Sequence, residues 1–527
     1  MLNNKIMHTG NVLAVGSQAS HILGRSMTNK QYRQYFKETI DKNENITLMN
    51  DYRVIGVDKS GSKIKKIKLE HAPYDEYGCP PEEGDGKHHA FSAKYFIDAS
   101  YEGELMAQQG VSYTVGRESA DHYGESHAGA EEVLMAYDVD PYNVPGKPSS
   151  GLLPGIMDRK AGDKTDGDDL VMGYGFRWKW DFDGGHEITP HNYDPDQFEM
   201  FRRGFLAQEN GTDVDIAVGH FIRDIKSKEV EEYSTSLDGW VMPENLRRSL
   251  LAPQNYGDNK DYPDGDYKTK ARIWKAEQSW VRNMVHFFKT DDSVPAPYQQ
   301  KAKKIKLASG HFDDTHGYPN QLYVREARRM ISDYVITQKD MENEKHVEDP
   351  IALATYGFDE WPYATIVHKE DGFKTDGIGL VGGYYSCYKL GYPYAIPYSA
   401  IVPKKTEASN LLVAVTVSAS HVAFSSLRME PVYLQLGEAA GKAAGIMAMK
   451  VDENGKFVDD DIQDIDYKEL RAAIEEDGGI VEVTHEMKKD YENLKSGRRH
   501  QDINMRLMNL DMQEIKDQNG VAVQGWA

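Results

Sequence analysis

The sequence contains few cysteines and no motif with zinc-type spacing. Only Cys79 and Cys387 occur among its 527 residues. Two thiols cannot supply the four ligands of an iron–sulfur cluster. A single disulfide between them is conceivable, but a reduced, cytoplasmic protein is the simpler interpretation. We predict no metal ligands.

The chain also lacks a basic cluster, a long apolar run and a signal-peptide pattern. With 62 Lys and Arg residues against 84 Asp and Glu residues, its formal net charge is −22. Without a basic arm, nucleic acid and anionic membranes are poor candidate partners. No run of 18 apolar residues is present to span a membrane, and the first residues lack the charged and apolar regions of a signal peptide.

Regular patterns near both ends of the chain enclose a long irregular region. Residues 28–45 have helical spacing, residues 46–70 are typical of short strands, and residues 89–100 are typical of one strand. Residues 120–330 are rich in Asp, Gly, Pro and aromatic residues, and 268–288 is the one clear helix among them. A chain of this length predicts two or three domains, with the irregular region inserted and carrying substrate contacts.

One segment, GIGLVGG at residues 377–383, fits the glycine pattern G-x-G-x-x-G. A pyrophosphate site of this kind needs a buried strand before the first glycine and a helix after the last one. The preceding residues are charged, and Gly391, Pro393 and Pro397 exclude a sustained helix afterwards. We therefore predict a tight loop between strands at this position.

A second segment, residues 411–445, has the buried strand followed by a helix that the first segment lacks. LLVAVTV at 411–417 is typical of a strand buried on both faces, and Glu430–Pro431 suits the start of a helix. Each glycine costs a helix about 1 kcal/mol, and three recur every four residues, at Gly437, Gly441 and Gly445. This stripe predicts a sheet or a flat ligand packed closely on it, and the residues alone leave both alternatives open.

Four stretches together resemble the FAD-dependent oxidoreductases that have a glutathione-reductase-type flavin fold. They are residues 93–119, 149–156, 322–341 and 392–444, and the resemblance covers about residues 20–475. The nearest branch contains bacterial proteins, some of which carry the label xanthan lyase. The resemblance implies an α/β fold: an incomplete FAD/NAD(P)-type Rossmann-like domain with an inserted mixed α+β substrate domain.

The resemblance also implies four units along the chain. They are a partial FAD-binding domain at 1–119, a mainly inserted substrate domain at 120–400, the C-terminal part of the FAD-binding domain at 401–475, and an acidic tail at 476–527. The family's first βαβ unit, whose G-x-G-x-x-G turn binds the ADP half of FAD, has no counterpart here. We expect a truncated gene product, a second polypeptide that supplies this unit, or loss of FAD binding.

Cofactor contacts follow from the same resemblance. The strand end that passes the flavin is commonly Asp-Ala-Thr-Gly in the family, and Tyr101 stands here in place of the glycine. The implied contacts in this stretch are Asp98, Ala99, Ser100 and Gly103. The implied contacts near the pyrimidine edge of the flavin and on the following helix are Ser425, Ser426, Arg428, Met429 and Gly437.

Three side chains are candidates for catalysis. His421 suits proton transfer because histidine titrates near neutrality, although a structural histidine is the alternative. Arg325 and Arg328, with Arg329 beside them, suit a substrate carboxylate or phosphate, although an internal Arg325–Glu326 ion pair is the alternative. Arg428 would stabilise a reduced flavin or simply pair with a carboxylate such as that of Glu430.

The resemblance implies hydride transfer between FAD and a small polar, carbohydrate-derived substrate. Two alternatives stay open: a xanthan-lyase-like polysaccharide lyase that uses no flavin, and a non-catalytic or partner-dependent fragment.

Overall fold

The computed structural model describes most of the chain between residues 29 and 485. The described ranges are 7–9, 12–14, 29–130, 133–163, 165–176, 178, 180–181, 184–209, 257–354, 356–382, 385–386 and 393–485. Cys387, Gly391 and most of the expected acidic tail lie outside them.

The centre of the predicted cofactor domain is a pair of parallel strands. β6 (Phe96–Asp98) pairs with β18 (Leu411–Val413) in register, so Asp98 lies opposite Val413. All three residues of β18 are buried, as the apolar run predicts. α3 (Glu104–Gln109) follows β6 and packs with both strands in one core. The α/β character expected from the sequence is therefore present.

A three-stranded antiparallel sheet covers one side of this core. It contains β3 (Tyr52–Ser60), β4 (Lys63–His71) and β5 (His88–Phe91), in that order. The single strand expected over residues 89–100 is wrong, because β5 pairs with β4 whereas β6 pairs with β18. The preceding helix, α2 (Asn29–Asp41), agrees with the helix expected over 28–45.

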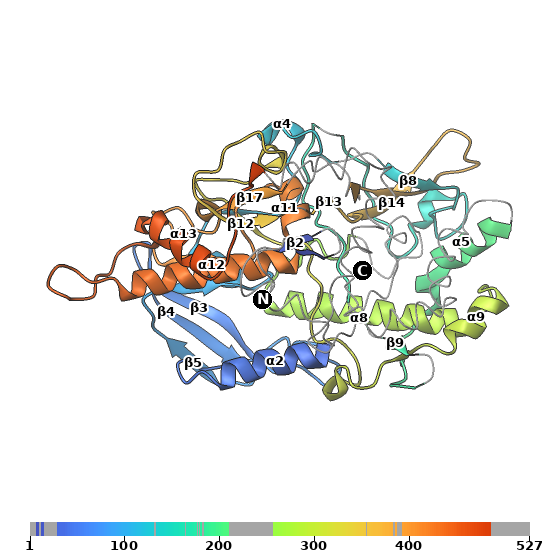
Figure 1. The fold of residues 1–527 in the computed structure, drawn as a ribbon. Helices are drawn as coiled ribbons and strands as arrows, with labels where there is room; N and C mark the ends of the chain where they lie inside the picture. The colour runs from blue at the N-terminus through green and yellow to red at the C-terminus, as the bar shows by residue number, and fades with distance from the viewer. Residues whose placement is uncertain are drawn as a thin grey trace, which may run out of the picture.

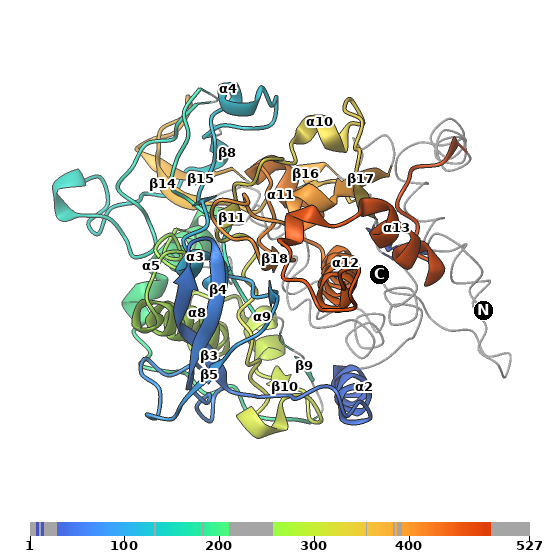
Figure 2. The same cartoon turned by 90° about the vertical axis from the view of Figure 1, so that its left-hand side faces the viewer.

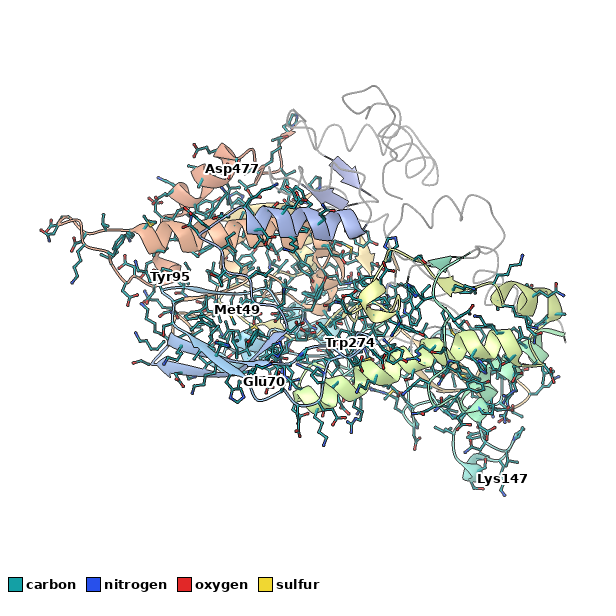
Figure 3. All side chains as sticks on the ribbon, turned by 90° about the horizontal axis from the view of Figure 1, so that it is seen from below. Met49, Glu70, Tyr95, Lys147, Trp274 and Asp477 are labelled. Atoms are coloured by element: carbon teal, nitrogen blue, oxygen red, sulfur yellow. The ribbon has the colours of Figure 1, made fainter. Side chains whose placement is uncertain are left out.

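Helix α12 (Glu430–Met449) forms where the sequence predicts it, with proline in its first turn. In Figure 1 it runs above β3 and β4, close to α13 (Tyr467–Glu476). Asp477, which Figure 3 labels at the end of α13, forms an ion pair with Lys442 of α12. The short hairpin of β1 (Met7–Thr9) and β2 (Val12–Ala14) places β2 beside α12.

The glycine stripe of α12 faces away from the described core. The buried face is formed by other residues, including Leu436, Ala440 and Met447. A Cβ atom added at Gly437, Gly441 or Gly445 would meet no described atom within 4 Å. The expected close packing of a sheet against this stripe is therefore wrong for the described part of the chain.

Most of the G-x-G-x-x-G match lies in a strand and not in the expected loop, and only its last glycine, Gly382, follows the strand. β15 (Gly377–Val381) is the central strand between β14 (Ala364–His368) and β8 (Val133–Tyr137). A Cβ atom at Gly377 would lie 2.3 Å from the carbonyl oxygen of Tyr137, and one at Gly379 would lie 2.8 Å from Val133. Glycine is needed here because neighbouring segments approach closely. The resulting spacing of glycines happens to match the nucleotide-binding pattern.

The middle of the chain has its own aromatic core. Figure 1 places α5 (Glu199–Glu209) and α9 (Ala296–Ala302) at the end of the molecule away from α12, and α8 (Tyr267–Thr290) runs from the middle of the molecule to that end. α8 agrees with the helix expected over 268–288, and Asp266 caps its first turn. Rings of α5, of α8 and of the short 3-10 helix η2 (Pro195–Phe198) pack on one another, among them Phe198, Phe201, Trp280, Phe287 and Phe288. Trp274 of α8, labelled in Figure 3, belongs to a second cluster with Tyr174 and Leu322.

Short strand pairs and helices join these parts. The regular elements within residues 321–341 are β11 (Arg329–Met330) and α10 (Gln338–Met341). β11 pairs with β7 (Tyr113–Thr114), β12 (Pro350–Ala354) with β17 (Tyr394–Pro397), β13 (Phe358–Asp359) with β16 (Tyr385–Ser386), and β9 (Trp180–Asp181) with β10 (Lys306–Leu307). β12 and β17 share a core with α12 and with α11 (His421–Leu427). Figure 2 shows β17, α11 and α12 close to one another.

The predicted domain boundaries stay predictions. No described helix is long and apolar enough to cross a membrane.

Replacing Gly103 with alanine should destabilise the fold more than a matched change at Gly61. Both glycines have positive φ, 65° and 59°, which costs alanine about 1 kcal/mol. A Cβ atom at Gly103 would also lie 2.7 Å from Thr416 Oγ1, whereas one at Gly61 would meet nothing within 4 Å. We expect a further loss of about 1–3 kcal/mol for Gly103→Ala, measured by urea unfolding. Equal losses in the two variants would contradict this contact.

Candidate functional site

The loop after β6 uses its polar side chains to hold its own backbone. Asp98 Oδ1 accepts hydrogen bonds from the amide of Ser100, at 3.0 Å, and from its hydroxyl, at 2.7 Å. Asp98 Oδ2 accepts from the amide of Met106 at 2.9 Å, and Ser100 Oγ accepts from the amide of Gly103 at 3.0 Å. Asp98 and Ser100 therefore shape the turn into α3, and Ala99 is exposed beside them.

His421 begins helix α11 and is fully buried. Its Nδ1 atom lies 2.6 Å from Glu118 Oε2, and its backbone amide donates to the same oxygen at 3.0 Å. The amide of Glu118 also points toward Nδ1, over a longer distance of 3.3 Å. Because an ionised carboxylate only accepts hydrogen bonds, the shorter contact requires the proton of a neutral His421 to be on Nδ1.

Glu118 is held between His421 and a fully buried arginine. Arg329 Nη2 donates to Glu118 Oε1 at 2.6 Å and to the carbonyl oxygen of Gly116 at 2.7 Å. Burial alone would raise the pKa of Glu118, but Arg329 and His421 lower it below its ordinary value. Burial lowers the pKa of His421, and Glu118 opposes this shift only in part. At neutral pH the pair is therefore a carboxylate and a neutral imidazole.

A second carboxylate binds the same arginine. Glu326, which is buried, forms an ion pair with Arg329. Burial raises the pKa of Glu326 to about 7, with Arg329 opposing the shift and Glu118 adding to it. Glu326 Oε2 has no hydrogen-bond partner among the described residues. This carboxyl group therefore titrates near neutrality.

The three neighbouring arginines point into three different environments. Arg325 donates to the carbonyl oxygen of Gly173, and its guanidinium lies 3.9 Å from the ring centroid of Trp361. Arg328 donates to Asp264 at 3.0 Å and forms an ion pair with Glu104. Arg329 occupies the buried position described above. The alternative ion pair within residues 325–326 is not what forms, since Arg329 is the partner of Glu326.

Arg428 directly follows α11, at the start of the short connection to α12. Its Nη1 atom donates to the Tyr323 hydroxyl at 3.1 Å, and its Nη2 atom donates to the Asp359 carbonyl oxygen at 2.9 Å. The Asp359 carboxylate lies 3.4 Å away, so the carboxylate pairing expected as an alternative exists, with Asp359 and not Glu430. Burial opposes its charge, yet Tyr323 and Asp359 raise the pKa of Arg428. Its Nε atom is buried without a partner in the described part of the chain.

The other cofactor candidates of this connection are bound within the protein. Ser425 Oγ donates to the carbonyl oxygen of Val422 at 2.7 Å, and Ser426 Oγ donates to that of Tyr356 at 2.6 Å. Met429 is buried at the N-terminal boundary of α12. Gly437 lies two turns further along this helix, on the open stripe. These positions form the frame of the connection.

Sequence reasoning missed two charged residues of this site. Glu118 contacts His421, and Arg117 donates to both oxygens of Asp168, at 3.0 and 2.5 Å. Both belong to the stretch at 93–119 that carries the family resemblance. The available signal was a charged dipeptide shortly after the strand β7, and both of its side chains are buried.

A sequence model described as FAD dependent oxidoreductase matches residues 4–474. The chain belongs to this family. Neither curated proteins nor solved structures yield a match. The family implies FAD as the cofactor of this oxidoreductase.

The residues of this member fit the isoalloxazine end of FAD. A flavin ring needs polar partners at one edge, and His421 Nε2 and Arg428 Nε are buried atoms that lack a partner in the described ranges. Such atoms are costly unless a ligand or water satisfies them. Arg428 precedes the start of α12, whose partial positive charge favours an electron-rich atom. No described strand-to-helix turn carries G-x-G-x-x-G for the ADP half.

Exchange of Glu326 for glutamine should remove a pH dependence of stability. The folded-state pKa is raised, to about 7 from 4.5, so this group stabilises the fold fully below pH 4.5. That stabilisation is lost as pH rises through 7, on the order of 1–3 kcal/mol. Glutamine keeps an oxygen for Arg329 but does not ionise. We expect the Tm of Glu326→Gln to fall less than that of the wild type between pH 5 and pH 8. Parallel Tm profiles would contradict this assignment.

Proposed function

We propose that this FAD-dependent oxidoreductase transfers hydride between FAD and a small polar, carbohydrate-derived substrate. The observation that carries the proposal is the connection between β18 and α12, which brings a buried base and a buried cation into one segment. Bound FAD would supply the redox chemistry. The residues of this chain would bind and orient the substrate, and one of them would exchange a proton with it.

We assign the proton exchange to His421. Oxidation of an alcohol releases a hydride from carbon and a proton from the hydroxyl group. With its proton on Nδ1, a neutral His421 keeps a lone pair on Nε2. Nε2 would accept the hydroxyl proton in oxidation and return it in reduction, as a general base and acid do.

We assign charge stabilisation to Arg428. Reduction leaves negative charge at the pyrimidine edge of a flavin, and a nearby cation lowers the energy of that state. Arg428 is anchored through both Nη atoms, so its Nε–H group is held in place for such a contact. Preorganised donors are effective because no reorganisation accompanies the reaction.

We assign substrate contact to Arg325 and a structural role to Arg328. Trp361 and Tyr323 hold the guanidinium of Arg325 at 3.9 and 4.8 Å from their ring centroids. An oriented guanidinium suits a substrate carboxylate or hydroxyl group. Arg328 is engaged by Asp264 and Glu104, which supports a role in joining chain segments. The acidic composition supports a small-molecule substrate over nucleic acid, and the low cysteine content supports a cytoplasmic location.

Arg428→Lys should make bound FAD harder to reduce. Lysine keeps the charge but loses the planar fork that reaches Tyr323 and Asp359. We expect the reduction potential to become more negative by about 30 mV, equal to about 1.4 kcal/mol for a two-electron couple. Absorbance during a reductive titration of FAD-loaded protein measures it.

The matched control for this experiment is Arg282→Lys. Arg282 is also a buried arginine, but it donates to the carbonyl oxygen of Thr189 and stacks on Tyr77 and Tyr318 within the aromatic part of the chain. Its replacement should leave the potential unchanged. Equal shifts in both variants would contradict the role of Arg428. Wild-type protein that stays colourless with added FAD would contradict the proposed function itself.

A further inference from the structure

Glu118 is the common acceptor for donors from two other parts of the chain. Its Oε2 atom faces the Nδ1 atom and the backbone amide of His421, and its Oε1 atom faces Arg329. The pairing of β7 with β11 brings Arg329 close to Glu118, because Arg329 lies opposite Thr114 in register. Four residues after Thr114, Glu118 meets the start of α11. Strand pairing and helix position together bring the three side chains into contact.

Arg329 fixes both sides of this contact. In addition to Glu118 and Glu326, its guanidinium binds the carbonyl oxygens of Gly116, at 2.7 Å, and Ala419, at 3.2 Å. Gly116 precedes Glu118 by two residues, and Ala419 precedes His421 by two residues. A single buried cation therefore immobilises the backbone that carries the carboxylate and the backbone that carries the imidazole.

An acceptor and a donor compete for the Nδ1 side of His421. The Glu118 carboxylate requires a proton on Nδ1, whereas the Glu118 backbone amide, 3.3 Å away, favours a bare Nδ1 and would place the proton on Nε2. The carboxylate contact is shorter and involves a charge, so it dominates. The charged groups that face His421 are Glu118, Arg329 and Arg117. Both arginines disfavour a doubly protonated imidazole.

We propose that Glu118 is a positioning residue that holds the proton of His421 on Nδ1 and so keeps Nε2 free to accept a proton. This inference rests on the proposed function for its catalytic meaning, because a proton on Nε2 would abolish the base. Arg329 keeps the carboxylate ionised and oriented. The three residues act as a base, an orienting anion and a fixed cation.

Glu118→Gln should reverse the tautomer of His421. Arg329 and the His421 backbone amide both need an acceptor from this side chain, at Oε1 and Oε2 respectively. The charged donor forms the stronger hydrogen bond, so Arg329 would take the oxygen of the glutamine amide and turn the NH2 group toward Nδ1. Nδ1 would then accept, and the proton would move to Nε2. In a Ser-His-Asp triad, the corresponding amide substitution leaves the wrong tautomer and costs about 10⁴-fold in kcat.

The tautomer can be measured by ¹⁵N NMR on the full chain labelled with ¹⁵N-histidine, without FAD or substrate. His421→Gln identifies the signals that belong to His421. We expect protonated Nδ1 and bare Nε2 in the wild type at neutral pH, and the reverse in Glu118→Gln. Wild-type protein with its proton on Nε2 would overturn the proposal even if the variant failed to fold, and so would a variant that keeps the wild-type signals.

Glu125→Gln is the matched control. Glu125 is a second buried glutamate, and its Oε1 atom accepts from Ser420 Oγ at 2.7 Å, one residue before His421, and from the amide of Gln338 at 2.7 Å. The Glu125→Gln substitution also replaces a buried carboxylate with an amide beside α11, but Glu125 does not contact the imidazole of His421. Its His421 signals should match the wild type, and a reversed tautomer in this variant would overturn the specific role of Glu118. Because the measurement needs no FAD, failure of cofactor binding would contradict only the proposed function.

Discussion

The neutralisation of one buried cation organises the centre of this protein. Arg329 is completely buried, and a buried guanidinium is tolerated only with paired charges and satisfied donors. It meets this requirement with Glu118 and Glu326 and with the carbonyl oxygens of Gly116 and Ala419. These partners come from three chain segments more than 80 residues apart. Removing one partner of such a pair typically costs about 3–5 kcal/mol, so the arrangement of these segments depends on it.

The same contacts couple the fold to the proposed chemistry. Glu118 neutralises Arg329 and also contacts His421, so one carboxylate serves stability and, in the function we propose, proton transfer. Glu326 takes the other side of the guanidinium, and burial raises its pKa to about 7. The two carboxylates therefore differ in protonation although they share one cation. Glu118 has two positively polarised partners at hydrogen-bond distance, whereas Glu326 has an oxygen without a partner in the described part of the chain.

Local patterns predicted the elements that depend on local chemistry. The buried strand at 411–413, the proline-started α12 and the capped α8 form as expected, because apolar runs and helix starts act over a few residues. The strand at 377–381 was missed because its glycines are required by the close approach of neighbouring strands that are distant in the sequence. His421 could be chosen from its type and place. Glu118 could not, because its role depends on a strand pairing between residues more than 200 positions apart.

The hydrogen bonding of the candidate site differs between the residues that shape its backbone and the residues to which we assign chemistry. Asp98 and Ser100 form their hydrogen bonds within the loop after β6 and the start of α3, and Ser426 bonds to a neighbouring segment. By contrast, His421 Nε2 and Arg428 Nε are buried and lack partners in the described ranges. Residues that complete their own bonding can hold a fixed geometry, and residues that do not must obtain the remaining partner from a ligand or water. These two atoms belong to the connection from β18 to α12, so the chemistry that we propose is concentrated there.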